Sequence, residues 1–318
     1  MPETLADKAL SDRLTAIEKR LDAALEALSR VSVIERRLEE AIPYFATRSD
    51  RLVGSQSIYL GDHTAVTFLR NGLRMLVDTR SLDVGIHLLT LGEWEQADMA
   101  LFAALIQPGD RALDIGANLG VYALHAALAV GPRGEVHAFE PNPRLAWLAD
   151  FSLKINGFGD YARLHQMGVS DTSGMAQLFF SDALSGSGAI LRERTSPDDK
   201  EVTCRLEALD ALFPDPGFTV DVIKMDIEGH EGFALRGMRQ LLARSPQVKI
   251  MMEYAPEWIA RAGYAPEVIF DVLDEIGLKI WTISDAGRLQ ASSRQALMST
   301  RKSIQNVLLA RALPQAFL

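Results

Sequence analysis

Cysteine is almost absent from this 318-residue sequence, which contains only Cys204. A single cysteine excludes an internal disulfide bond and any cysteine-rich metal site. No residue near Cys204 in the sequence resembles an activating base, so we expect a half-buried strand residue and not a catalytic thiol.

Long apolar runs are absent as well. No stretch approaches the roughly 18 consecutive apolar residues that a membrane-spanning helix needs. The N-terminus has a charged, helical pattern that differs from that of a signal peptide. We therefore expect a cytoplasmic protein with no membrane span.

Positive charge is scarce, since 33 Lys and Arg stand against 42 Asp and Glu, which leaves a net charge of −9. Nucleic-acid-binding surfaces depend on clustered positive charge. Because the sequence contains no basic stripe, we expect no nucleic-acid partner. The length suffices for one large domain and an accessory segment.

The N-terminal region carries a heptad pattern. Apolar residues recur at alternating spacings of four and three from Leu10 to Val31, with charges of both signs between them. This spacing predicts a coiled coil, and therefore a homo-oligomer of undetermined order. A single amphipathic helix packed on the domain is the alternative. Pro43 ends the helix, so the first unit covers residues 1–43.

A lead-in region follows at residues 44–110. It contains a predicted β-hairpin, in which strands at 66–69 and 74–77 flank a two-residue turn at Asn71-Gly72. A helix is expected at about residues 94–105.

From residue 111 to 318 strands and helices alternate, which predicts an α/β domain with a mostly parallel sheet and helices on both faces. We expect seven strands in this sheet, with the last pair antiparallel, and a separate hairpin at 176–180 and 201–206. The expected strands are 111–115, one ending at Glu140, 163–169, 221–227, 248–253, 278–283 and 303–309, and the helices are 119–130, 144–156, 231–243 and 266–275.

The first candidate site is the turn after strand 111–115. It contains Asp114, Gly116, Asn118 and Gly120, and Glu140 follows at the end of the next strand. Glycines let the backbone turn sharply and approach a ligand. The next helix points its positive N-terminus at that ligand, and a carboxylate at the second strand's end can accept hydrogen bonds from a ribose diol.

Two kinds of nucleoside cofactor could fit this turn. Dinucleotides usually need G-x-G-x-x-G, whereas this chain has G-x-N-x-G preceded by Asp114. An acid there repels a pyrophosphate but suits a cationic ligand with an amino-acid end, which favours S-adenosylmethionine. A nicotinamide or flavin cofactor, or glycines used only for packing, remain alternatives.

The second candidate site lies at the end of strand 221–227. The sequence there places five ionisable residues together, with Glu253 ending the neighbouring strand; the five are Lys224, Asp226, Glu228, His230 and Glu231. Ligands of open α/β sheets bind at this edge. Crowded carboxylates repel one another, so at least one should have a raised pKa, which suits a general base.

Each of these residues also has a structural alternative. Asp226 could cap the next helix, and Glu228 and Glu231 could be acids that the helix dipole favours. Lys224 could be a counter-ion, and His230 could be a solvated turn residue. The carboxylates could also hold a hard divalent ion, but the spacing matches no known ligand pattern, so no metal site is predicted.

Taken together, the segments LDIGANLGVYAL, FEPNP, IKMDIEGHE and MEY resemble the FkbM-type S-adenosylmethionine-dependent methyltransferases. The lead-in Gly92-Glu93-Trp94-Glu95 is similar too, whereas the N-terminal heptads are not part of the family pattern. The resemblance implies a class I methyltransferase fold of seven strands and methyl transfer to a hydroxyl, commonly of a sugar or polyketide-like product. It implies donor contacts from Asp114, Gly116, Asn118 and Glu140, with Asn142 nearby and Glu95 closing over the donor, and it places Asp226, Glu228 and Glu231 toward the acceptor.

The expected function is therefore S-adenosylmethionine-dependent O-methylation of a hydroxyl on a sugar, glycan or related natural product. Transfer would be direct and in line, with an acid of the 226–231 cluster, aided by His230, removing the hydroxyl proton. The alternatives are N-methylation, metal-dependent O-methylation of a phenol or catechol, and a cofactor-binding scaffold for assembly.

Overall fold

A computed structural model describes residues 19–22, 25, 57–190, 196–299 and 304–313 of the chain. The chain divides into two compact units, residues 1–53 and 54–318. Within the predicted coiled coil only Lys19–Asp22 and Leu25 are described, and they are helical and exposed. The rest of that segment lies outside the described residues, so the coiled coil and the homo-oligomer stay predictions.

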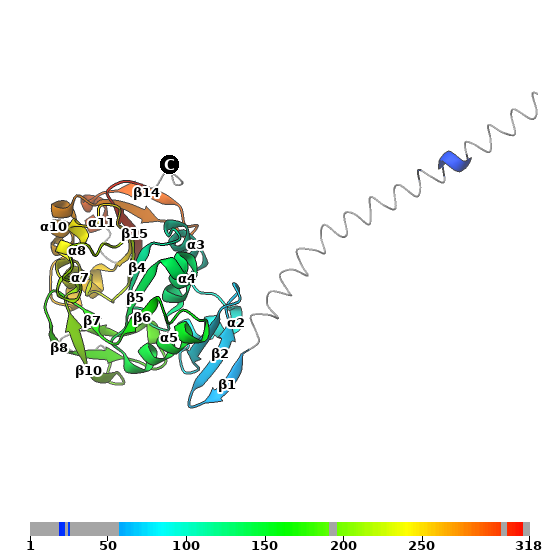
Figure 1. The fold of residues 1–318 in the computed structure, drawn as a ribbon, viewed down its shortest axis with the longest axis horizontal. Coiled ribbons are helices and arrows are strands. Elements are labelled where there is room, and N and C mark those ends of the chain that lie inside the picture. The colour runs from blue at the N-terminus through cyan, green and yellow to red at the C-terminus, as the bar shows by residue number, and fades with distance from the viewer. Residues whose placement is uncertain (1–18, 23–24, 26–56, 191–195, 300–303, 314–318) are drawn as a thin grey trace, which may run out of the picture. The chain divides into compact units, whose positions relative to one another are not determined.

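The second unit is built on an eight-stranded sheet with the order β14-β13-β15-β12-β11-β4-β5-β6 (Figure 1). Strands β4, β5, β6, β11 and β12 are parallel, while β15 is antiparallel to both β12 and β13. The seven predicted strands are present, and β14 is an eighth that the sequence analysis missed. The bounds are β4 Arg111–Ile115, β5 Glu135–Phe139, β6 Ala162–His165, β11 Val222–Met225, β12 Lys249–Tyr254, β13 Lys279–Ile283, β14 Leu289–Ser292 and β15 Gln305–Ala310.

Helices cover both faces of this sheet, as predicted (Figure 1). Helices α3, α4 and α5 contribute to one apolar core, and α7, α8 and α10 contribute to the other. The helices are α2 Val84–Leu91, α3 Gln96–Leu105, α4 Val121–Val130, α5 Pro143–Ile155, α6 Leu209–Leu212, α7 Glu231–Arg236, α8 Arg239–Ala243, α9 Pro256–Arg261, α10 Glu267–Ile276 and α11 Arg294–Ser299. None of them is both long and apolar enough to cross a membrane, within the residues that are described.

Strand alternation decides which polar residues share a face. In β4, Ala112 packs into the core under α3–α5, while Leu113 and Ile115 pack into the opposite core. Side chains two apart point the same way, so Asp114 lies on the α3–α5 side. In β11, Lys224 is the register partner of Asp114 and therefore shares this face.

A second sheet has the order β7-β10-β8-β9, with β7 Gly168–Val169, β8 Gly174–Phe180, β9 Ala189–Ile190 and β10 Lys200–Glu207. The predicted hairpin is confirmed by the antiparallel pair β8 and β10. The predicted strand 163–169 is wrong as one element, because β6 ends at His165 and β7 pairs with β10. Cys204 is a buried residue of β10, and burial raises its pKa to about 11, so the thiol is not activated.

The lead-in is a three-stranded antiparallel sheet of β1 Ile58–Gly61, β2 Thr64–Phe68 and β3 Arg74–Asp78. The predicted hairpin is present, but its turn has three residues and not two. The amide of Leu69 bonds the carbonyl of Leu73, and Gly72 closes the turn with φ +85°. Only a glycine adopts this left-handed conformation without strain.

The predicted helix 231–243 is also two elements, since α7 ends before Gly237 and α8 begins at Arg239. A Cβ on Gly237 would lie 1.9 Å from the carbonyl oxygen of Ser170. The backbone of the second sheet therefore approaches too closely for any side chain at this position.

Gly237→Ala should consequently lower the free energy of unfolding by about 1–3 kcal/mol, the usual cost of overpacking. Urea denaturation would measure the change. Gly174→Ala is the matched control, because nothing lies within 4 Å of the added methyl group. Equal midpoints for the two variants would contradict the assignment of the helix break to this contact.

Candidate active site

Asp114, the residue before the last in β4, is a buried carboxylate, and one of its oxygens has no hydrogen-bond partner among the described residues. The residue is 1% exposed, and the unpartnered oxygen is Oδ2. Burial raises its pKa to about 7, although Lys224 acts in the opposite direction. A cation or a hydrogen-bond donor that binds this carboxylate would offset the free-energy cost of its desolvation.

The two glycines with left-handed backbone conformation in the turn after β4 are required by packing, which the sequence pattern did not reveal. Gly116 has φ +86°, and a Cβ there would lie 1.9 Å from the carbonyl oxygen of Asp226. Gly120 has φ +88°, and its Cβ would meet Ala149 on α5 at 2.8 Å. Both glycines are therefore required by packing against neighbouring elements. Gly116 still lines the cavities described below, whereas Gly120 lines neither.

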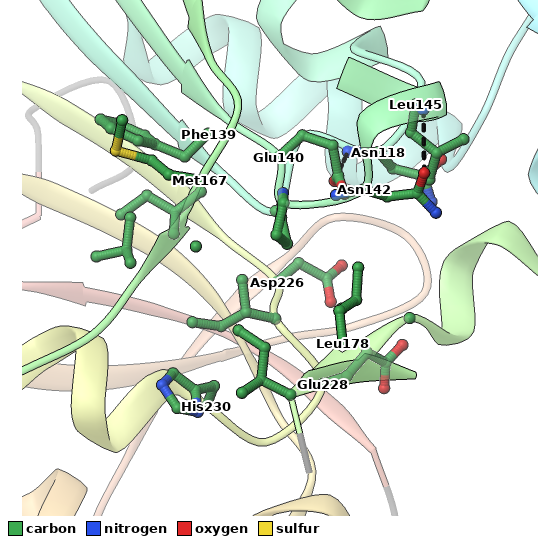
Figure 2. A pocket seen from close by; sticks show the side chains of 18 of the residues that line it. Asn118, Phe139, Glu140, Asn142, Leu145, Met167, Leu178, Asp226, Glu228 and His230 are labelled. Carbon is green, nitrogen blue, oxygen red and sulfur yellow. Dashed lines mark hydrogen bonds between the residues drawn. The ribbon is translucent and has the colours of Figure 1, made fainter. Parts of the chain in front are cut away.

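Glu140 follows β5 and ties this turn to the next strand. One carboxylate oxygen accepts from the amide of Asn118 at 2.8 Å and the other from the amide of Asn142 at 2.8 Å. Asn142 in turn caps α5, accepting from the amides of Arg144 and Leu145 (Figure 2). Burial raises the pKa of Glu140 to about 7, while the two amides lower it.

Glu140, Asn118 and Asn142 line a first cavity that is partly open to solvent. Figure 2 places Glu140, Asn118 and Asn142 on one side and Asp226 and Glu228 on the other. Its remaining lining is largely apolar and comes from β5, α5 and the second sheet. This apolar lining includes Phe139, Leu145, Met167, Leu178 and Ile190.

A second cavity adjoins the first on the α3–α5 side of the sheet. Its lining is polar and includes Asp83, Trp94, Glu95, Asp114, Tyr122, Lys224 and Glu253. Five residues line both cavities, namely Gly116, Asn118, Gly186, Asp226 and Glu228. A group that passes from one cavity to the other must therefore pass Asp226 and Glu228.

Three carboxylates meet at this junction. Oxygens of Asp226, Glu228 and Glu253 lie within 4.8 Å of one another, so the predicted placement of Glu253 beside the cluster is confirmed. Burial and neighbouring carboxylates raise the pKa of Glu228 to about 9 and that of Glu253 to about 8. Among the residues described, this trio is the group of acids that could hold a metal ion.

Lys224 offsets part of this negative charge. Its Nζ atom lies 3.0 Å from Oδ2 of Asp226 and 5.0 Å from the centre of the Tyr122 ring. Burial lowers its pKa, but Asp226 and Glu95 outweigh that effect and the pKa is raised. The 2% exposed lysine therefore remains charged among the acids. Lys224 is therefore a counter-ion of Asp226, as one of the two alternatives for this residue states.

Two of the predicted catalytic residues lie away from the junction. Glu231 lines neither cavity, and its Oε1 accepts from the amides of Ile227 and Gly229, which shapes the turn before α7. His230 reaches the first cavity, but it is buried, its Nε2 contacts the hydroxyl of Ser170 at 3.0 Å, and burial lowers its pKa to about 4. A solvated histidine is therefore excluded, and this neutral imidazole is anchored.

Glu95 lines the second cavity and not the first. It has a left-handed φ of 44° and accepts a hydrogen bond of 2.8 Å from the hydroxyl of Tyr122. Asn118 and Glu228 also have positive φ, at 52° each. Such backbone conformations cost energy outside glycine and concentrate at functional sites.

The sequence analysis missed Tyr122, Trp94 and Asp83 as cavity residues. Tyr122 lies in the first turn of α4, directly after the glycine turn, and that position was a usable signal. Trp94 was noted only as part of the lead-in motif. Asp83 had no signal, because its contacts come from a loop about a hundred residues away.

Comparisons with known proteins identify the family. The Methyltransferase FkbM domain matches residues 114–279, just over half of the chain. The chain therefore belongs to the FkbM methyltransferase domain family, as the sequence resemblance indicated. Its matched region runs from the last two residues of β4 to the first residue of β13 and includes both candidate sites.

A relative named 31-O-demethyl-FK506 methyltransferase FkbM, from Streptomyces tacrolimicus, is 34% identical over 122 residues. The match covers 38% of this chain and 42% of that relative. A solved FkbM methyltransferase from Methylobacillus flagellatus is 15% identical, covering 66% of this chain and 50% of that one, with a TM-score of 0.37. An S-adenosylmethionine-dependent O-methyltransferase from Thermotoga maritima is 12% identical, covering 82% and 87%, with a TM-score of 0.39.

The crowded acids predict an unusual pH dependence of stability. The folded state keeps protons that the unfolded chain has released, because the pKa values of Asp114, Glu140, Glu228, Glu231 and Glu253 are all raised to between about 7 and 9. Stability must then fall as pH rises through these values. Between pH 7 and 9 we expect a loss of roughly 2–5 kcal/mol.

Urea denaturation of the ligand-free protein at pH 7 and pH 9 would measure this loss. A double variant, Glu228→Gln with Glu253→Gln, should flatten most of the dependence. Stability that rises over this interval would show that the junction is not protonated in the folded state.

Proposed function

We propose that this chain transfers a methyl group from S-adenosylmethionine to a hydroxyl group of a sugar, glycan or related natural product. The observation that carries the proposal is the junction of the two cavities at Asp226 and Glu228. The first cavity has the features of a nucleoside site, and Asp114 in the second cavity would hold the donor's amino-acid end. The second cavity also contains Glu95 and Glu253, which can accept hydrogen bonds from hydroxyl groups.

The residues present fit the donor. The unpartnered Oδ2 of Asp114 is suited to an ammonium group, and the apolar side chains of the first cavity are suited to an adenine ring. Glu140 lies beside the position proposed for the ribose. The backbone amides of Asn118 and Asn142 hold its carboxylate in place. When bound, S-adenosylmethionine supplies an electrophilic methyl group on a positively charged sulfur.

The chain's own residues would orient the acceptor and take its proton. Asp226 and Glu228 line both cavities, so a hydroxyl directed at the methyl group would approach one of their carboxylates. The Nζ atom of Lys224 lies 3.0 Å from Oδ2 of Asp226, and the carboxylate of Asp226 would accept the proton. Positioning of the two reactants would supply much of the rate enhancement.

Calorimetric titration with S-adenosylmethionine, S-adenosylhomocysteine and NAD tests the donor half of this proposal. Micromolar binding of the first two and none of NAD is the expected result. A mass-spectrometric screen of hydroxylated sugars and polyketide-like acceptors for a gain of one methyl group tests the other half. A folded sample that binds none of the three ligands would refute the proposal and favour an assembly scaffold.

Metal-dependent O-methylation is a second candidate, favoured by the trio of Asp226, Glu228 and Glu253. Three oxygen ligands so close together suit a hard divalent cation. Activity that is lost on dialysis against a chelator and restored by Mg²⁺ would select this mechanism over direct proton removal. Cytoplasmic residence and a homo-oligomer formed by the N-terminal helix complete the proposal.

A further inference from the structure

A short wall segment in the connection between β8 and β9, Ser185–Gly188, borders both cavities. Ser185, Gly186 and Gly188 line the first cavity, and Gly186 also lines the second. This wall segment follows β8 and precedes the two-residue strand β9. Few ladder hydrogen bonds therefore hold it, and its position must depend on contacts elsewhere.

Those contacts converge on Asp83, at the start of α2. The amide of Gly186 donates to Oδ2 of Asp83 at 2.9 Å, and the amide of Ser185 donates to Oδ1 at 3.1 Å. The hydroxyl of Ser185 contacts the same Oδ1 at 3.2 Å, and the hydroxyl of Ser81 donates to it at 2.7 Å. Two successive amides thus bind one carboxylate, an arrangement that orients a loop strongly.

The orientation of Asp83 is unusual for its position. An aspartate at a helix N-cap ordinarily accepts from the first amides of its own helix. Here the side chain makes no N-cap bond of this kind, although the amide of Val84 also lowers its pKa, and Ser81 accepts from the amide of Gly85. The carboxylate is thereby free for a loop about a hundred residues later in the chain.

The fit between Asp83 and the wall segment is close. A Cβ on Gly186 would lie 3.3 Å from Oδ2 of Asp83, and a Cβ on Gly85 would lie only 2.7 Å from the Cβ of Ser81. Burial raises the pKa of Asp83, but the hydrogen bonds from Gly186, Ser81 and Ser185 outweigh it and the pKa is lowered. The carboxylate therefore stays ionised at neutral pH and keeps its acceptors available.

We infer that Asp83 is a positioning residue that holds the wall segment Ser185–Gly188 against the donor, so that this carboxylate of the lead-in region contributes to donor affinity. The inference rests on the proposed function, since it assigns the donor's nucleoside part to the first cavity. It adds that the family domain beginning at residue 114 does not by itself complete the donor site.

The test compares Asp83→Asn with wild type by calorimetry using S-adenosylmethionine. An amide cannot accept from both Ser185 and Gly186 through equivalent oxygens, so we expect Kd to rise about tenfold, which corresponds to about 1.4 kcal/mol. Asp182→Asn is the matched control. Asp182 lies on the same loop and pairs with Arg80 at 2.7 Å and with Lys200, but it lines neither cavity. Such partly exposed pairs contribute little, so its Kd should stay within about twofold.

Hydrogen exchange in the ligand-free protein separates positioning from general destabilisation. Amides of residues 184–188 should exchange faster in Asp83→Asn, while those of β4 and β5 keep their wild-type rates. If Asp83→Asn does not fold, Ser185→Ala should give a smaller rise in Kd, of about threefold, with the same local exchange.

If the wild-type protein binds the donor and the folded variants bind it with the same Kd, the inference is overturned and the proposed function stays intact. Absence of donor binding in wild type would refute both. Faster exchange throughout the domain would also overturn the inference, because it would assign Asp83 a general structural role.

Discussion

Asp114→Asn should weaken binding of S-adenosylmethionine by about 100-fold or more. The substitution keeps the size of the side chain but removes a carboxylate that is 1% exposed and has one oxygen unpartnered. Breaking one side of a buried ion pair costs about 3–5 kcal/mol, which exceeds a 100-fold change in Kd. Calorimetry at pH 7.5 would measure the loss, with the exposed Asp160→Asn as the matched control.

The wild-type protein should show a related pH effect. Because burial raises the pKa of Asp114 to about 7, protonation competes with the donor's ammonium group below that value. Donor affinity should fall about tenfold between pH 7 and pH 5.5, and this fall should be absent in Asp114→Asn. Equal affinities of wild type and Asp114→Asn at pH 7.5 would remove Asp114 from the donor site.

Asp226→Asn should lower kcat by about 10²–10⁴, the usual contribution of a positioned general base. The residue lines both cavities, and its Oδ2 atom pairs with Lys224 at 3.0 Å. Donor affinity should change little, since the donor contacts proposed above come from other residues. Methyl transfer measured under single-turnover conditions would separate the chemical step from binding.

Asp215→Asn, on the surface loop before β11, is the control for this variant, because Asp215 contacts only the backbone of its own turn. Glu228→Gln provides a comparison at the junction itself. If Asp226→Asn keeps its kcat but has a higher Kd for the donor, Asp226 acts in donor binding. If the large fall in kcat occurs in Glu228→Gln instead, Glu228 is the base.

Local patterns predicted the parts of the fold that depend on local physics. The alternation of strands and helices gave the parallel sheet, and the acids after β4 and β5 were placed correctly at its carboxyl edge. The prediction that Glu253 lies beside Asp226 also holds, because neighbouring parallel strands end at one edge. The edge strand β14 was missed because its residues are mostly exposed and lack an apolar pattern.

Contacts between distant segments explain what the sequence did not reveal. The break at Gly237 comes from the backbone of Ser170, and the glycines at 116 and 120 are needed for Asp226 and Ala149. The sequence also did not reveal that the carboxylate of Glu231 accepts hydrogen bonds from the amides of Ile227 and Gly229 in its own loop. The spacing of residues along the chain does not predict the close contacts of these three glycines, because each contact joins two segments that are brought together only by the fold.

The position of β15 has a consequence for synthesis. This strand, the last one described, lies between β12 and β13, which precede it in the chain. Residues 305–310 must therefore leave the ribosome before the centre of the sheet can close, and until then one edge of β12 has no neighbour. Glu253, whose register partner is Asn306, would acquire its final surroundings only at that moment. A nascent chain stalled before residue 305 should carry the glycine turn and Asp114 but lack a completed junction, and its exposed strand edge is a natural target for chaperones.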